Sequence, residues 1–197
     1  KEAVDRLLEH PDVKAVSFVG STPVARYIYQ KAAAHGKRVQ AQGGAKNPII
    51  ILPDADPEMT VKIVADSAFG CAGQRCLAAS LAVTVGEAGK TFPQRLREAA
   101  LERVLGNGLH ESVHMGPVIN KESRDRIEGL IEAGVSQGGN LVLDGRGAKI
   151  EGCEGGSFVK PTIIDGLTPD AELLGTEIFG PVLTMLNFDS MDDVIAW

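Results

Sequence analysis

Apolar residues along this chain occur in two patterns, and each pattern predicts a different secondary-structure element. Short segments predict strands at residues 13–19, 38–42, 48–52, 80–85, 141–143, 159–164 and 181–188, and the apolar runs at 13–19 and 48–52 predict buried ones. Apolar residues three and four positions apart predict helices, which cover residues 2–8, 23–34, 58–72, 92–104, 121–137 and 192–197. Because helices and strands alternate throughout, the sequence predicts an α/β fold built on a parallel sheet.

The segment between the first strand and the first long helix is a candidate anion site. Gly20 and Ser21 follow the strand, with Thr22 as the predicted N-cap and Pro23 as the first helical residue. Backbone N–H groups at such a helix start suit a phosphate or pyrophosphate, although many ordinary strand–helix turns also use Gly-Ser. The glycine-rich segment 43–47 then joins two predicted strands, either as a ligand-binding strand end or as a hinge between domains.

Composition and charge narrow the class of protein. The chain has 197 residues, 44% of them hydrophobic and 23% charged, which is enough for one large domain or two small ones. Its formal net charge of −6 and the lack of a basic run argue against nucleic-acid binding. No apolar stretch approaches the ~20 residues needed to cross a bilayer. The chain starts at Lys1 rather than Met and stops inside a helical pattern at Trp197, so we expect a piece of a longer protein.

Cys76 is the strongest candidate for chemistry. It ends the segment 69–76, where glycines and small residues break a helical pattern, so its thiol lies on a predicted turn. The adjacent Arg75 cation and nearby backbone N–H groups favour the thiolate, which is the nucleophilic form. A buried structural cysteine is the alternative, because free cysteine is among the most buried residue types.

The other cysteines and the histidines predict little chemistry. Cys71 and Cys153 are interpreted as structural, with oxidative pairing of Cys71 and Cys76 left open. The odd number of cysteines, three, indicates a reducing compartment. His110 and His114 follow glycines rather than lying on a helix, and no third ligand accompanies them, so the sequence predicts no metal site.

A second candidate site lies just before the last predicted strand. Glu177 and Phe179 occur in the segment Glu177–Pro181, which contains a Gly-Pro turn. An acidic group beside an aromatic ring could hold ribose hydroxyls and cover a flat ring. The alternative is an ordinary turn that leads into a strand.

Taken together and in this order, these segments resemble the aldehyde dehydrogenase superfamily. The matching segments are Phe18–Thr22, Gly43–Pro48, Leu52–Asp56, Gly73–Cys76, Met115–Pro117, Lys160–Thr162 and Glu177–Val182. The resemblance covers essentially the whole chain. It implies a three-layer catalytic domain with a parallel sheet at residues 44–197, truncated at its C-terminal end. It also implies that residues 1–43 are the last β-α-β part of a Rossmann-like, NAD-binding domain.

The resemblance assigns roles to residues at both candidate sites. Cys76 would attack the aldehyde carbonyl, lose a hydride to NAD from the resulting thiohemiacetal and keep the acyl group as a thioester. The N–H group of Cys76 would help to hold the oxyanion. Gly20 and Ser21 would lie near the pyrophosphate, Glu177 would bind the nicotinamide ribose and Phe179 would lie against the nicotinamide. Because the family's side-chain oxyanion donor lies outside this chain, we expect the chain alone to be inactive.

One position departs from the usual family pattern. Aligned on Lys46, the glutamate that acts as base for the deacylating water is replaced by Gln42. An amide cannot accept a proton at working pH, and a general base is worth about 10²- to 10⁴-fold in rate. A thiol such as coenzyme A needs less help, because a few per cent of it is already thiolate near neutral pH. The segments containing Lys46 and Cys76 are also similar to the CoA-acylating branch of the family, methylmalonate-semialdehyde dehydrogenase.

Two other functions stay open at this point. One is a hydrolytic aldehyde dehydrogenase, dependent on NAD or NADP, in which another group replaces the missing base. The other is a binding or structural relative without turnover, against which the presence of both Cys76 and Glu177 argues.

The same resemblance implies a substrate, an oligomeric state and a cellular location. Semialdehydes of malonate or methylmalonate carry a carboxylate, which Arg75 could pair with and orient, whereas a helix-end salt bridge is the alternative for this arginine. The sequence does not choose between the two semialdehydes. We expect a homo-oligomer for the full-length protein, located in the cytoplasm of a bacterium or, in a eukaryote, in the mitochondrial matrix.

Overall fold

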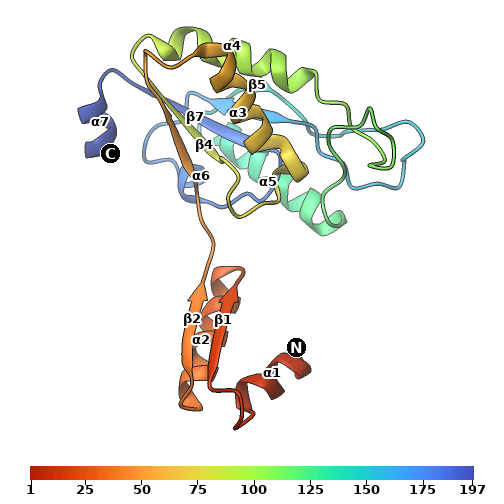
Figure 1. Ribbon diagram of the computed structural model, residues 1–197. Helices are drawn as coiled ribbons and strands as arrows, with labels where there is room; N and C mark the ends of the chain where they lie inside the picture. The colour runs from red at the N-terminus through yellow and green to blue at the C-terminus, as the bar shows by residue number, and fades with distance from the viewer. The chain divides into compact units, whose positions relative to one another are not determined.

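The computed structural model describes residues 1–197 and divides into two compact units (Figure 1). We call Lys1–Ala45 the N-terminal unit and Lys46–Trp197 the C-terminal unit. The alternation of helices and strands predicted from the sequence is confirmed in both units. None of the helices combines the length and the apolar character needed to cross a membrane.

The N-terminal unit is a parallel β-α-β element preceded by a short helix. Its elements are α1 (Glu2–Glu9), β1 (Ala15–Val19), α2 (Thr22–Ala34) and β2 (Arg38–Gln42). The two strands pair in parallel, with Ala15 opposite Arg38 and Val19 opposite Gln42. Because a parallel pair needs a crossover connection, α2 must pack back onto the strands, and it does so through Ile28.

The start of α2 differs from the prediction in its capping residue. Ser21 rather than Thr22 is the N-cap, and the Ser21 side chain makes no capping hydrogen bond. Thr22 is the first helical residue, and its Oγ1 instead accepts a hydrogen bond of 3.0 Å from the N–H of Gly44. The hydroxyl predicted to cap the helix therefore fastens the segment that follows β2.

The C-terminal unit is built around a five-stranded sheet with the order β3-β4-β7-β6-β5. Its strands are β3 (Pro48–Ile51), β4 (Leu81–Val85), β5 (Asn140–Leu143), β6 (Thr162–Asp165) and β7 (Val182–Phe188). All pairs are parallel except β5 with β6, which is antiparallel. The prediction of a parallel sheet is therefore wrong for this edge. The physical reason is that a loop without a helix joins β5 to β6, and parallel neighbours need a crossover.

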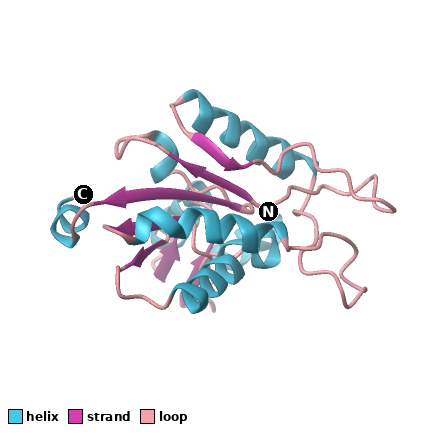
Figure 2. Ribbon diagram, turned by 90° about the horizontal axis from the view of Figure 1, so that it is seen from above, coloured by secondary structure: helices cyan, strands magenta, loops and turns pink.

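Helices cover the sheet on two sides. They are α3 (Pro57–Phe69), α4 (Ala88–Leu101), α5 (Lys121–Ser136), the short α6 (Glu172–Gly175) and α7 (Met191–Ala196). Figure 1 shows α4 and α5 on opposite sides of the strands, and Figure 2 shows helices on both sides of them, which gives a layered helix–sheet–helix arrangement. The core between the layers includes fully buried Leu96 of α4, Ile131 of α5 and Leu183 of β7.

The predicted element boundaries fail mainly where special backbone geometry intervenes. The helix expected at residues 58–72 stops at Phe69, and Gly70–Gly73 forms a separate 3₁₀ turn. The strand expected at 159–164 begins only at Thr162. The sequence did not predict α6, because a single helical turn has too few residues to show a period.

Candidate active site

The turn that carries Cys76 is shaped by left-handed backbone. We call residues Gly70–Ala78 the nucleophile turn. Cys71 and Ala72 both have φ of 52°, and Gly73 has φ of +66°. Helix α3 has already ended at Gly70, whose ψ of 139° lies outside the helical region, and the left-handed residues that follow prevent the α-helix from resuming. Cys76 emerges on the exposed part of the turn. A thiol buried in the core, the alternative considered from the sequence, is thus not what the fold produces.

Hydrogen bonds from distant segments hold this turn in place. The Asn47 side chain donates to the carbonyl oxygens of Cys76 and Ala78, at 2.7 and 3.0 Å. Ser67 Oγ accepts from the N–H of Ala79 at 2.9 Å. Gln74 Oε1 accepts from the N–H of Ile119 at 3.0 Å, which ties the turn to the segment before α5. At about 1 kcal/mol each, these bonds help to fix the turn, in which residues 75–77 are exposed.

Arg75 is directed at the end of α3 rather than at an acidic group. Its Nη2 donates to the carbonyl oxygens of Asp66 and Ser67, at 2.8 and 2.9 Å. These carbonyls belong to the last turn of the helix, where the Asp66 oxygen also accepts from the N–H of Gly70, so the guanidinium adds to the cap of the helix. The sequence alternative for Arg75, a helix-end salt bridge, is therefore wrong about the partner, because Arg75 binds backbone carbonyl oxygens and not a carboxylate. A guanidinium has five N–H donors, and those on Nε and Nη1 are not used in these bonds.

The second candidate segment forms a strained turn. We call residues Thr176–Gly180 the Glu177 turn. Glu177 is half-buried, and the side chain of Phe179 is 41% exposed. Phe179 has φ of 51°, a left-handed conformation that costs a non-glycine residue about 1–2 kcal/mol. A hydrogen bond from Arg126 Nη2 to the Ile178 carbonyl oxygen helps to hold it.

The nucleophile turn and the Glu177 turn lie directly against each other. A Cβ atom built on Gly73 would lie 2.0 Å from the carbonyl oxygen of Gly180. A Cβ atom on Gly180 would in turn lie 2.6 Å from Ile127 Cδ1. Gly73 is therefore required for the close approach of the two turns, and Gly180 for the packing of the Glu177 turn against α5. Sequence reasoning missed this contact, although both glycines stand inside the motifs that carry Cys76 and Glu177.

Lys46, which the sequence marked as an alignment point and as part of the candidate strand-end segment 43–47, contacts the Glu177 turn. Its Nζ donates to the carbonyl oxygen of Thr176 at 3.1 Å, across 130 positions of the chain. Burial lowers the pKa of the Lys46 ammonium to about 8, and the nearby Glu177 carboxylate counteracts part of that shift. The Glu177 turn thus has a half-buried cation next to its carboxylate.

The residues predicted to meet a dinucleotide phosphate lie in the N-terminal unit. The N–H of Gly20 donates to the carbonyl oxygen of Gln42 at 3.1 Å, which closes the end of β1 onto β2. Ser21 leaves its hydroxyl free, and the first N–H groups of α2 have no acceptor within the helix. This combination suits a phosphate. Gln42 ends β2 and is exposed.

The C-terminal unit thus brings Cys76, Arg75, Glu177 and Phe179 onto two touching turns, whereas Gly20, Ser21 and Gln42 share the β1–β2 end of the N-terminal unit. The roles predicted for all seven remain predictions.

The remaining cysteine and histidine side chains have other surroundings. Cys71, interpreted as structural from the sequence, is instead exposed, and Cys153 is partly buried. No group of three or more His, Cys, Asp or Glu side chains is arranged to hold a metal ion. His114 Nδ1 accepts a hydrogen bond of 3.2 Å from the N–H of Val104, so this ring fastens its own loop.

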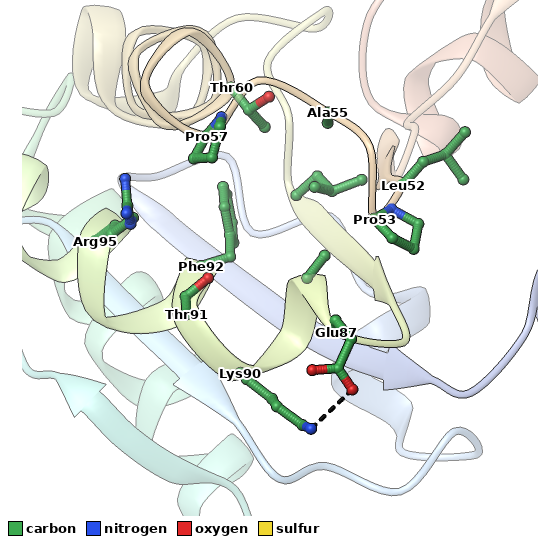
Figure 3. Close-up of a pocket in the computed structure, with 12 residues that line it drawn as sticks. Leu52, Pro53, Ala55, Pro57, Thr60, Glu87, Lys90, Thr91, Phe92 and Arg95 are labelled. Atoms are coloured by element: carbon green, nitrogen blue, oxygen red, sulfur yellow. Dashed lines mark hydrogen bonds and ion pairs between the residues drawn. The ribbon is translucent and has the colours of Figure 1, made fainter.

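A pocket of about 330 Å³ lies elsewhere in the C-terminal unit (Figure 3). Phe92 of α4 and Ile51 of β3 contribute apolar lining, and Arg95 stands at its edge. Glu87 and Lys90, which also line the pocket, form an exposed ion pair at 2.7 Å. None of the residues of the two turns lines this pocket, so it is separate from the candidate site.

Comparison with known proteins identifies the family. The aldehyde dehydrogenase family profile matches residues 1–197. Malonate-semialdehyde dehydrogenase 1 of Geobacillus kaustophilus is 46% identical over 196 residues, which are 100% of this chain and 40% of that protein. The acylating mitochondrial methylmalonate-semialdehyde/malonate-semialdehyde dehydrogenase of Bos taurus is 44% identical over 194 residues, 98% of this chain and 36% of that protein.

Solved structures agree with this match. The methylmalonate-semialdehyde dehydrogenase of Oceanimonas doudoroffii superposes with a TM-score of 0.95 at 44% identity, covering 100% of this chain and 40% of that one. A candidate methylmalonate-semialdehyde dehydrogenase of Sinorhizobium meliloti 1021 in complex with NAD superposes with a TM-score of 0.94 at 45% identity, covering 98% of this chain and 40% of that one. The chain therefore belongs to the aldehyde dehydrogenase family, and it spans 36–40% of the length of these relatives.

Proposed function

We propose that this member of the aldehyde dehydrogenase family carries the nucleophile and part of the NAD site of a CoA-acylating semialdehyde dehydrogenase. The activity is proposed for a full-length polypeptide, since the chain spans only 36–40% of the compared relatives. The observation that carries the proposal is the direct contact between the turn with the exposed Cys76 thiol and the turn with Glu177 and Phe179. This contact brings the turn that carries the sulfur nucleophile against the turn that carries the carboxylate and the exposed ring.

The chain's own groups support covalent catalysis on Cys76. The thiolate would form a bond to the aldehyde carbon while the carbonyl electrons move to oxygen, giving an oxyanion. The Cys76 N–H makes no hydrogen bond within the chain and is free to donate to that oxyanion. When bound, NAD accepts a hydride from the aldehyde carbon, which leaves the acyl group on Cys76 as a thioester.

The residues available for NAD fit the parts of a dinucleotide. The half-buried Glu177 carboxylate can accept hydrogen bonds from ribose hydroxyls, and the exposed Phe179 ring offers a flat apolar face. The free N–H groups at the start of α2, together with the uncommitted Ser21 hydroxyl, suit the pyrophosphate. We accordingly assign residues 1–43 to the end of the NAD-binding domain and residues 44–197 to the catalytic domain.

The fate of the thioester depends on Gln42. Without a carboxylate at this position, attack by water lacks its usual base and should be about 10²- to 10⁴-fold slower. The thiolate of coenzyme A attacks the thioester carbon without that help, and the Cys76 sulfur leaves as thiolate. The names of the relatives, which include acylating enzymes for malonate and methylmalonate semialdehydes, agree with this assignment.

The proposed substrate is a semialdehyde with a carboxylate close to its carbonyl. Nε and Nη1 of Arg75 are the donors next to Cys76 that could pair with this group. The compared relatives are bacterial and mitochondrial, so we place the enzyme in the bacterial cytoplasm or, in a eukaryote, in the mitochondrial matrix. We further propose that the full-length enzyme assembles from identical subunits.

A product assay tests the function. The full-length enzyme is incubated with NAD and malonate or methylmalonate semialdehyde, with and without coenzyme A, and the products are identified by mass spectrometry. We expect acyl-CoA, with NADH formation that requires coenzyme A for sustained turnover. Free acid formed at the same rate without coenzyme A would show a hydrolytic enzyme instead. Absence of NADH under both conditions would favour a relative without turnover.

A further inference from the structure

Two consecutive residues at the start of the C-terminal unit reach the two turns of the candidate site. Lys46 donates from Nζ to the carbonyl oxygen of Thr176, directly before Glu177. Asn47 donates from Nδ2 to the carbonyl oxygens of Cys76 and Ala78. The side chains of one dipeptide thus contact both the turn with the proposed ribose ligand and the turn with the nucleophile.

The backbone of this dipeptide is itself fixed by the sheet. The carbonyl oxygen of Asn47 accepts from the N–H groups of Ser80 and Leu81, at 3.1 and 3.3 Å. The N–H of Asn47 donates to Ser80 Oγ at 2.9 Å. These bonds continue the pairing of β3 with β4 by one residue. Asn47 is therefore held against the segment after Cys76 by its backbone as well as its side chain, and Lys46 starts from a fixed point.

Lys46 also interacts with Glu177 through charge. Its ammonium is half-buried, and the Glu177 carboxylate is the ionisable group that acts on it. Burial lowers the pKa of Lys46 to about 8, so its charge is present at neutral pH and is lost under mildly alkaline conditions. When Lys46 loses its proton, the Glu177 carboxylate, which must accept hydrogen bonds from ribose, loses the cation that orients it.

We propose that Lys46 and Asn47 are positioning residues that set the Glu177 carboxylate and the Cys76 backbone relative to each other. Lys46 acts on NAD binding through Glu177, and Asn47 acts on acyl transfer through Cys76. This inference rests on the proposed function, because it assumes that Glu177 binds NAD and that Cys76 carries the acyl group. It predicts that changes at two adjacent residues affect two different steps.

The test for Lys46 measures NAD binding directly in the full-length enzyme by titration calorimetry. Lys46→Met removes the donor and the charge and should weaken NAD about 10-fold, the effect of one charge-assisted hydrogen bond. Lys46→Arg keeps both and should restore most of the affinity. Lys62→Met serves as the control, because Lys62 is an exposed lysine on α3 outside both turns. Circular dichroism verifies that each variant is folded, and Lys46→Arg keeps the test valid if the Met variant unfolds.

The pH dependence adds a readout that a merely structural role would not change. Lys46 is charged below its folded pKa of about 8, so NAD affinity of the unmodified enzyme should fall between pH 7 and 9. The guanidinium introduced by Lys46→Arg stays charged throughout, which should remove that fall. Equal pH profiles in the two proteins would overturn the role of the Lys46 charge.

The test for Asn47 separates catalysis from cofactor binding. Asn47→Ala removes both side-chain hydrogen bonds to the nucleophile turn and should lower kcat about 10-fold or more, as misplaced reacting groups do. NAD affinity should stay unchanged, and Asn47→Gln, which keeps the amide, should recover part of kcat. Unchanged NAD affinity in Lys46→Met would overturn the inference. So would a loss of the same quantity, either NAD affinity or kcat, in both Lys46→Met and Asn47→Ala. An unmodified enzyme that binds no NAD would instead overturn the proposed function.

Discussion

The β1–α2 turn of the N-terminal unit and the nucleophile turn of the C-terminal unit are built in opposite ways. The first uses neighbouring backbone: Gly20 donates to the end of β2, and Ser21 opens α2 without a side-chain bond. The second depends on side chains from far along the chain, above all Asn47 and Gln74. It also contains three successive residues with left-handed backbone, two of which are not glycine.

This difference separates two kinds of functional loop. The β1–α2 turn takes its anion-binding geometry from a strand, a glycine and a helix start, which any β-α unit can supply. The nucleophile turn keeps a left-handed Cys71 and Ala72 only because surrounding hydrogen bonds and the contact between Gly73 and Gly180 impose them. We therefore expect substitutions in the nucleophile turn to have larger effects than those in the β1–α2 turn.

The largest expected effect comes from the nucleophile itself. Cys76→Ser in the full-length enzyme should lower kcat at least about 10³-fold, because a hydroxyl is a far weaker nucleophile than a thiolate. The matched control is Cys71→Ser, an equal change at the other exposed cysteine of the same turn, which should keep most of the activity. Steady-state NADH formation measures both. Comparable losses in the two variants would mean that Cys76 is not the reacting sulfur.

The next effect tests the lost base at the end of β2. Gln42→Glu should raise formation of free acid about 10²-fold, the lower end of what a general base contributes. Gln40→Glu is the control, since it adds the same charge two residues earlier on the exposed side of β2. The readout is the ratio of free acid to acyl-CoA. If Gln42→Glu leaves that ratio unchanged, the missing carboxylate does not explain a preference for coenzyme A.

The contact between the two turns can be broken at Gly73. Gly73→Ala forces an L-residue to φ of +66° and drives a methyl group into the Gly180 carbonyl oxygen. We expect a loss of about 3 kcal/mol in the free energy of unfolding, from backbone strain and overpacking together. Gly129→Ala, at an exposed position of α5 with open space around it, should instead gain up to about 1 kcal/mol. Denaturant unfolding of both proteins measures this contrast, and equal stabilities would contradict the close packing.

The proposed substrate role of Arg75 predicts a selective effect. Arg75→Leu should raise KM about 10-fold for a semialdehyde acid, the effect of one charge-assisted hydrogen bond, and much less for an uncharged aldehyde of equal size. The variant also loses the cap on α3, so thermal unfolding is measured in parallel. Equal increases in KM for both aldehydes would leave Arg75 with the capping role alone.

The smallest effect is expected in the β1–α2 turn. Ser21→Ala should weaken NAD binding about 3-fold, as the loss of a neutral hydrogen bond does, with little change in stability because this hydroxyl caps nothing. Asp56→Ala is the opposite case, since the Asp56 carboxylate accepts from the N–H of Met59 at 2.8 Å and caps α3. Its loss should cost about 1 kcal/mol of stability without affecting NAD. A stability loss of similar size in Ser21→Ala would refute a free hydroxyl at this position.

Much of the architecture could be predicted from the sequence because it depends on local patterns. Short strand-like runs and helical spacings of three to four residues gave the alternating elements, and the β-α-β unit ending at Gln42 was predicted with its second strand at the observed residues. The order of short motifs indicated the family that the comparisons identify. Exposure of Cys76 followed from glycines and small residues around it, which cannot build a buried stripe.

The tertiary structure alone decided how distant residues meet. Nothing local in the sequence says that β5 runs antiparallel to β6 or that Gly73 lies against Gly180. Lys46 reaches Thr176 across 130 positions, and such a pairing has no period to show it. The physical reason is that hydrophobic periodicity and helix capping act between near neighbours, whereas these contacts exist only after the sheet has brought its strand ends together.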